Sequence, residues 1–201
     1  AILDPTSRGE GGAARLRAAR VSVDTGVLAD EALLVLGPWL AALREGRPQV
    51  TWAYHLGPGG HRAVPDDLAS ASALRCGFDA VLHEDGSVDE GVPGTHGQGA
   101  FALPPTDLSH GAHTVLSSLY AGGTRSLLLD GGVAMAQPFL DATLIDEVRI
   151  YLASRAPMDP DHSGHLDWPL LPPGFRLRHL RKLRDLVVIE ATRHADASHE
   201  P

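Results

Sequence analysis

The sequence predicts an α/β domain of three layers (αβα), with helices on both faces of a mixed, mostly parallel central sheet. Two observations lead to this prediction. Short apolar segments of strand character alternate with helical segments through the middle of the chain, as in domains built from strand–helix–strand units. The chain then ends in two strand-like segments, residues 175–182 and 186–191, whose close spacing predicts an antiparallel pair at one edge.

The individual elements follow from apolar periodicity and from turn residues. Strands are expected at residues 21–23, 49–55, 79–82, 101–103, 126–129 and 147–153. Helices are expected at residues 11–20, 31–43, 67–76, 112–120 and 133–142. Asp30 is a candidate N-cap for the second helix. Pro38 is expected to break or restart that helix, because proline has no amide donor. The glycine-rich residues 84–98 and the residues 156–174, rich in proline and aspartate, are expected to be loops.

Composition limits the kinds of partner. The chain has 201 residues, a net charge of −8 and a pI of about 5.7. An acidic surface argues against nucleic acid or an anionic membrane as the main partner. The single cysteine, Cys76, cannot form an intrachain disulfide, and no apolar run reaches the roughly 18 residues of a membrane span. We therefore expect a cytoplasmic protein.

A glycine turn after a buried strand is the strongest local feature. The apolar residues 127–129 precede Asp130, Gly131 and Gly132, and a helix is expected to start directly afterwards. This geometry points the amides of the helix start beyond the carboxyl end of the strand, where they can bind phosphate. The alternative is a tight strand-to-helix turn without a ligand. The motif is not G-x-G-x-x-G, so a Rossmann dinucleotide site is not indicated.

A longer motif runs through residues 127–153. It reads L-L-L-D-G-G, then A-M-A, P-F-L and finally I-D-E-V-R-I-Y-L-A. This order resembles the RibD C-terminal reductase family of riboflavin biosynthesis. Residues 47–60, 74–82 and 85–93 resemble further segments of the family in the same order, and residues 4–32 resemble the end of its deaminase domain. The resemblance implies a dihydrofolate-reductase-like fold.

The resemblance also implies a division into domains. Residues 1–46 are expected to be a remnant of the deaminase domain with a linker helix, residues 47–194 the reductase-like domain, and residues 195–201 a disordered tail. The deaminase signature, H-x-E with P-C-x-x-C, is not found in this sequence. We therefore expect neither deaminase activity nor a catalytic zinc ion.

Carried over position by position, the resemblance implies the roles of several residues. Arg75 matches an arginine that binds the substrate phosphate, and Asp130 matches a substrate-binding glutamate. Ser87 matches a residue that contacts the cofactor, NADPH. The turn and helix start match the segment that binds the cofactor phosphate, namely Gly131, Gly132, Val133, Ala134, Met135 and Ala136. From the residues alone, Arg75 could also be simply a solvated cation at a helix end.

The departures from the family pattern lie on the substrate side. Ala53 stands where the family has lysine, Gly57 where it has serine, and Gly59 where it has aspartate. Gly91 replaces the first aspartate of a D-D-P motif, and Asp130 is one methylene shorter than glutamate. Each of the first four replacements removes a charged or hydrogen-bonding group that glycine or alanine cannot supply.

Other chemically active residues receive structural interpretations. The pairs His110/His113 and His162/His165 have the spacing of metal ligands but are expected to be exposed histidines, so no metal site is predicted. Cys76 is expected to be a small buried apolar residue. Asp146 and Glu147 are interpreted as structural carboxylates. A basic run is expected to form one solvated strand face, and it comprises Arg176, Arg178, Arg181, Lys182 and Arg184.

The expected function is therefore that of an NADPH-dependent reductase of a phosphorylated ribosylamino-pyrimidine, in a chain that forms homodimers as the family does. The cofactor would carry the hydride, so the protein mainly has to position its ligands. The alternative is a lapsed homologue that binds a nucleotide or a partner chain without turnover, which the departures at Ala53, Gly59 and Gly91 favour. A purely structural dimer partner is a third, weaker interpretation.

Overall fold

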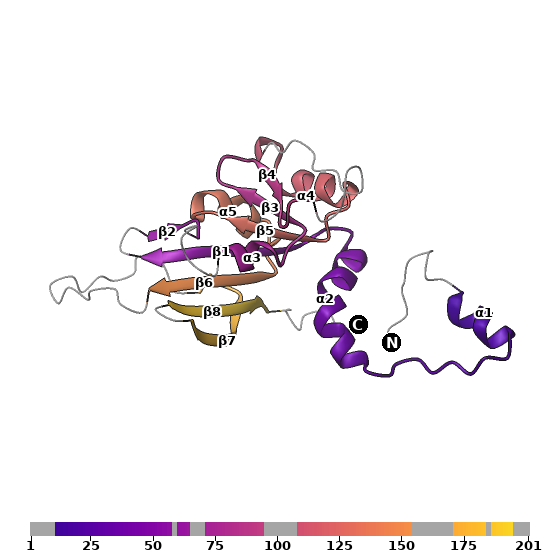
Figure 1. The fold of residues 1–201 in the computed structure, drawn as a ribbon. Helices are drawn as coiled ribbons and strands as arrows, with labels where there is room; N and C mark the ends of the chain where they lie inside the picture. The colour runs from indigo at the N-terminus through magenta and orange to yellow at the C-terminus, as the bar shows by residue number, and fades with distance from the viewer. Residues whose placement is uncertain are drawn as a thin grey trace.

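The computed structural model describes residues 11–57, 60–64, 71–94, 108–153, 171–183 and 186–194. These residues form an α/β structure around one mixed sheet (Figure 1). The strands are β1 (Gln49–Gly57), β2 (Gly60–Arg62), β3 (Ala80–His83), β4 (Val88–Glu90), β5 (Ser126–Asp130), β6 (Glu147–Ala153), β7 (Phe175–Leu183) and β8 (Leu186–Arg193). The helices are α1 (Gly12–Ala18), α2 (Ala29–Glu45), α3 (Ala71–Arg75), α4 (Ala112–Ala121) and α5 (Val133–Asp141), with a 3₁₀ turn, η1, at Leu108–His110.

The order of strands is β4-β3-β5-β1-β6-β8-β7, with β2 paired to the end of β1. The four central strands, β3, β5, β1 and β6, are mutually parallel. Antiparallel strands flank them, β4 on one side and the β8–β7 pair on the other. The predicted mixed sheet with an antiparallel edge is therefore confirmed, and the antiparallel pairing extends to both edges.

Two apolar clusters lie on the two faces of the sheet, which gives the predicted three layers. Helices α4 and α5 cover one face, where Trp52, Leu116 and Phe139 are fully buried. Helix α3 covers the other face together with Val64. A central parallel strand such as β5 is apolar on both sides, because both faces of the sheet are covered.

An ion pair joins the start of β1 to the start of β6. The carboxylate of Asp146 accepts hydrogen bonds from both Nη atoms of Arg47, each at 2.7 Å, and from the amide of Val50 at 2.8 Å. The side-chain bond to Asp146 is the main reason why the pKa of Arg47 is raised above its ordinary value. Asp146 therefore has the structural role predicted for it, and Glu147 pairs locally with Arg149.

Several predictions for the first 45 residues were wrong. Residues 21–23 form no strand. Helix α2 begins at Ala29, so Asp30 lies in its first turn rather than at the N-cap. The helix continues through Pro38 to Glu45. Because Pro38 is exposed, water can satisfy the carbonyl that its missing amide leaves unpaired. None of the described helices is long and apolar enough to cross a membrane.

Two short strands, β4 in the glycine-rich region and β2 after β1, were not predicted from the sequence. Strand β4 lies within residues 84–98, and β2 forms a hairpin with β1.

Strand β7 is exposed on both faces, with Leu177 55% and Leu180 63% exposed, because it is the edge strand and no described helix covers it. The basic run therefore does not form a single solvated face. Arg184, the predicted strand 101–103 and residues 67–70 of the third predicted helix lie outside the described residues.

Replacing Asp146 with alanine tests the link between β1 and β6. We expect Asp146→Ala to lower the free energy of unfolding by about 1–3 kcal/mol, because the Val50 amide loses its acceptor and the largely covered Arg47 guanidinium keeps only Glu45 as a carboxylate partner. Urea unfolding measures the change. Asp141→Ala, at the exposed end of α5, is the control and should change the value by less than about 0.5 kcal/mol. Equal effects of the two substitutions would contradict this role.

Candidate active site

The carboxyl ends of the parallel strands meet at one edge of the sheet, where α/β proteins bind their ligands. Ala53 on β1, Asp130 on β5 and His83 on β3 are neighbours in register across three strands. Paired residues of adjacent strands point to the same face, so these three positions share the face that α3 covers. The candidate site is built around these three positions.

The carboxylate of Asp130 is buried, with its side chain 1% exposed. Oδ1 accepts the amide of Val64 at 3.0 Å. Oδ2 accepts Nε of Arg75 at 2.9 Å and Nη2 of Arg75 at 2.6 Å. The structure therefore brings together the two residues predicted to bind substrate, but it pairs them with each other. Arg75 is not simply a solvated cation at a helix end.

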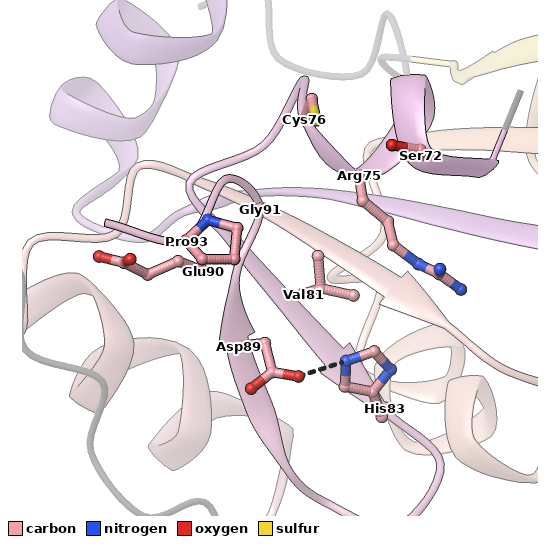
Figure 2. A pocket seen from close by; sticks show the side chains of 9 residues that line it. All are labelled: Ser72, Arg75, Cys76, Val81, His83, Asp89, Glu90, Gly91 and Pro93. Carbon is pink, nitrogen blue, oxygen red and sulfur yellow. Dashed lines mark ion pairs between the residues drawn. The ribbon is translucent and has the colours of Figure 1, made fainter. Parts of the chain in front are cut away.

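A pocket of about 740 Å³ opens beside this pair (Figure 2). Figure 2 shows the Arg75 side chain entering it from α3 and the His83 side chain from β3. Nε2 of His83 lies 3.2 Å from Oδ2 of Asp89 on β4. Cys76 also lines the pocket and is exposed, so the prediction of a buried cysteine was wrong. It lies just beyond the end of the short helix α3.

Gly91 lines the same pocket and has a steric role. A Cβ atom at this position would lie 2.0 Å from the carbonyl oxygen of Phe78 and 2.4 Å from that of Arg75. Both are backbone atoms, so a side chain cannot fit without moving the chain. Glycine at position 91, one of the departures noted above, is therefore required by the way β4 packs against the end of α3.

The glycine turn lies at the same edge, at the start of α5. Gly131 and Gly132 are buried, and the indole Nε1 of Trp52 donates a hydrogen bond of 2.9 Å to the carbonyl of Gly131. The amide of Gly132 donates to the carboxylate of Glu84, which follows β3. The turn has the backbone arrangement that suits a phosphate. Its Gly132 amide, however, is already bound to a carboxylate of the chain itself.

The other predicted cofactor residues are spread over two elements. Met135 and Ala136 pack into the core, Ala134 is exposed and Val133 is partly buried, so the first two cannot present their side chains to a ligand. Ser87 lies in the exposed turn before β4. Its hydroxyl donates to Oδ1 of Asp85 at 2.6 Å, and this bond is the main cause of a lowered pKa of the Asp85 carboxyl.

Sequence reasoning missed three contributors to this edge: Glu84, His83 and Trp52. Glu84 and His83 carried a usable signal, because they are polar residues at the end of a buried strand, where ligand-binding groups gather. Trp52 carried none, since a tryptophan in an apolar strand is most simply a core residue. Among the described residues, no group of three or more His, Cys, Asp or Glu side chains is placed to hold a metal ion. His162 and His165 lie outside the described residues.

Comparison with known proteins identifies the family. The model of the RibD C-terminal domain matches residues 109–156, a range that contains Asp130, the glycine turn and β6. The riboflavin biosynthesis protein RibD of Mycobacterium tuberculosis is 31% identical, over 76% of this chain and 56% of that protein. The chain belongs to the RibD C-terminal reductase domain family. It spans a little over half the length of this curated RibD relative.

Solved RibD structures share the fold. A diaminohydroxyphosphoribosylaminopyrimidine deaminase/5-amino-6-(5-phosphoribosylamino)uracil reductase from Thermotoga maritima superposes with a TM-score of 0.64 at 19% identity, over 95% of this chain and 69% of that one. RibD from Acinetobacter baumannii gives a TM-score of 0.62 at 15% identity, over 92% and 69% of the two chains. The predicted dihydrofolate-reductase-like RibD fold is confirmed.

A double-mutant cycle tests whether Arg75 and Asp130 act as a pair. We expect Arg75→Met and Asp130→Asn each to lower the free energy of unfolding by about 2–4 kcal/mol, because each leaves a covered partner without its counter-charge. The double variant should lose less than the sum, with a coupling energy of about 1–3 kcal/mol measured by urea unfolding. Additive effects would show that the two side chains are energetically independent.

Proposed function

We propose that this chain is an NADPH-dependent reductase of a phosphoribosylamino-pyrimidine of the 5-amino-6-(5-phosphoribosylamino)uracil type. One observation carries the proposal: in a member of the RibD reductase family, Arg75 and Asp130 meet at the carboxyl edge of the sheet, at the side of an open pocket. The reductase named among the similar structures acts on a substrate of this class.

Arg75 is the residue of the pocket that suits an anionic ligand bound through its phosphate, while Asp89 and Glu90 also line the pocket and add negative charge. Arg75 presents a guanidinium whose position is set by Asp130, and a fork of donors of this kind matches phosphate oxygens. His83 stands on the same face of the sheet, next to Asp130 in register. A substrate phosphate would have to share Arg75 with Asp130 or take it over. NADPH, when bound, supplies the hydride.

The turn at Gly131 and Gly132 would hold the cofactor phosphate, with Trp52 keeping the turn in place. This assignment extends to Val133, Ala134 and Met135 through their backbone amides, and to Ser87 through its hydroxyl. The amide of Ala136 already donates to the carbonyl of Gly132, so Ala136 would contribute only to the shape of the turn. We further propose that the active form is a homodimer, as the family resemblance implies. The alternative, binding without turnover, is favoured by one observation: Ala53, next to Asp130 in register, is fully buried and offers no polar group.

Steady-state kinetics test the proposal. Purified protein is mixed with NADPH and the phosphoribosylamino-pyrimidine, and NADPH absorbance is followed. We expect oxidation that depends on the substrate. Arg75→Lys should raise KM about tenfold with little change in kcat, because lysine keeps the charge but loses the fork that binds phosphate. Arg44→Lys, on the exposed side of α2, is the matched control and should behave as the wild type.

Two other outcomes would count against the reductase. No oxidation above background at any NADPH concentration would exclude it. Calorimetric binding of the pyrimidine or of NADPH without oxidation would instead support the lapsed homologue.

A further inference from the structure

The Glu84 side chain covers the start of helix α5. Glu84 is the first residue after β3, and its Oε1 accepts a hydrogen bond from the amide of Gly132. Gly132 is the N-cap residue of α5, with extended backbone. A carboxylate from a different element therefore binds the helix end that the glycine turn was predicted to offer to a ligand.

The packing over Gly131 gives a second observation. A Cβ atom on Gly131 would lie 2.5 Å from Cγ of Glu84 and 2.9 Å from Sδ of Met135. The space above the turn is thus filled by these two side chains, while Trp52 binds its carbonyl. The chain's own glutamate therefore passes directly over the backbone of Gly131.

An anion at this place satisfies an unpaired amide and interacts favourably with the helix dipole. A carboxylate and a phosphate have the same requirements, and they repel one another, so they cannot both bind the Gly132 amide. Glu84 itself is an exposed residue in the β3–β4 turn, so its side chain can leave without unpacking the core. The neighbouring Asp85 does not share this position, because it binds the amide and hydroxyl of Ser87.

We propose that Glu84 is an internal anion that competes with the cofactor phosphate for the start of α5 and thereby sets how tightly this chain binds NADPH. The inference rests on the proposed function, since it takes the glycine turn as the place of the cofactor phosphate. In the structure described here the turn is closed by Glu84. Binding of a phosphate requires the Glu84 side chain to move away. The free energy of the hydrogen bond that Glu84 then loses reduces the affinity for the phosphate.

Two substitutions at position 84 test the competition. Glu84→Ala removes both the charge and the acceptor, and Glu84→Gln removes the charge while keeping an amide oxygen. We expect NADPH to bind about tenfold or more tightly to Glu84→Ala, because no charge-assisted hydrogen bond has to be broken, with Glu84→Gln between this variant and the wild type. Inorganic pyrophosphate should follow the same order. Asp141→Asn removes one charge from the other end of α5 and should match the wild type.

Calorimetry gives the affinities, and the amide resonance of Gly132 reports where the anion binds. It should shift on addition of pyrophosphate to Glu84→Ala at concentrations that leave the wild type unchanged. Thermal unfolding confirms that each variant is folded. Because Glu84→Gln preserves the size of the side chain, it keeps the test valid where the alanine variant does not fold.

The outcomes separate this inference from the reductase activity. Unchanged or weaker binding of NADPH and pyrophosphate to both Glu84 variants overturns the competition, even where the wild type oxidises NADPH. Tighter binding without any oxidation supports the competition and overturns the reductase. Lack of binding in all variants overturns both.

Discussion

The carboxylate of Asp130 imposes the main constraint on the functional edge of this molecule. It ends the central strand β5 and is almost fully buried, and a buried charge is costly unless it is paired and hydrogen-bonded. Val64 and Arg75 supply these bonds from two segments that are distant in sequence from β5. Helix α3 therefore ends where its last residue can reach Asp130, and β4 packs against the end of α3 so closely that only glycine fits at position 91.

The same edge holds a second carboxylate, that of Glu84, which is satisfied by a backbone amide instead of a cation. Asp130 ends β5 and Glu84 binds the start of α5, and each carboxylate already has a partner within the chain. A phosphorylated ligand thus meets an edge at which the Arg75 guanidinium and the Gly132 amide already have partners. Arg75 has to be shared with Asp130, and the Gly132 amide has to be released by Glu84. The binding free energy at this site is therefore the energy of the hydrogen bonds that the ligand makes, less that of the internal hydrogen bonds that it replaces.

Prediction from the sequence succeeded where local pattern and burial agree. Strand β6 was predicted with its exact bounds, and β5, α4 and α5 to within one residue, since β5 is almost wholly apolar, β6 alternates and the two helices are periodic. It failed where tertiary contacts decide the outcome. Strand β4 is only three residues long and exists because β3 offers it an edge, and the short segment at residues 21–23 finds no such partner. Helix α2 tolerates Pro38 because that position faces solvent.

The sequence by itself determined the family, the mixed sheet and the place of the glycine turn, because these depend on the order of apolar segments and on residue types along a short stretch of chain. Only the tertiary structure decided what occupies the turn. Glu84 and Gly132 are far apart in sequence, as are Arg75 and Asp130, and no periodicity relates them. The pairing of Glu84 with Gly132 follows from the parallel register of β3 and β5, which brings His83 beside Asp130 and so carries Glu84 to the start of α5. The sequence predicted an anion site, and the fold places one of the chain's own anions in it.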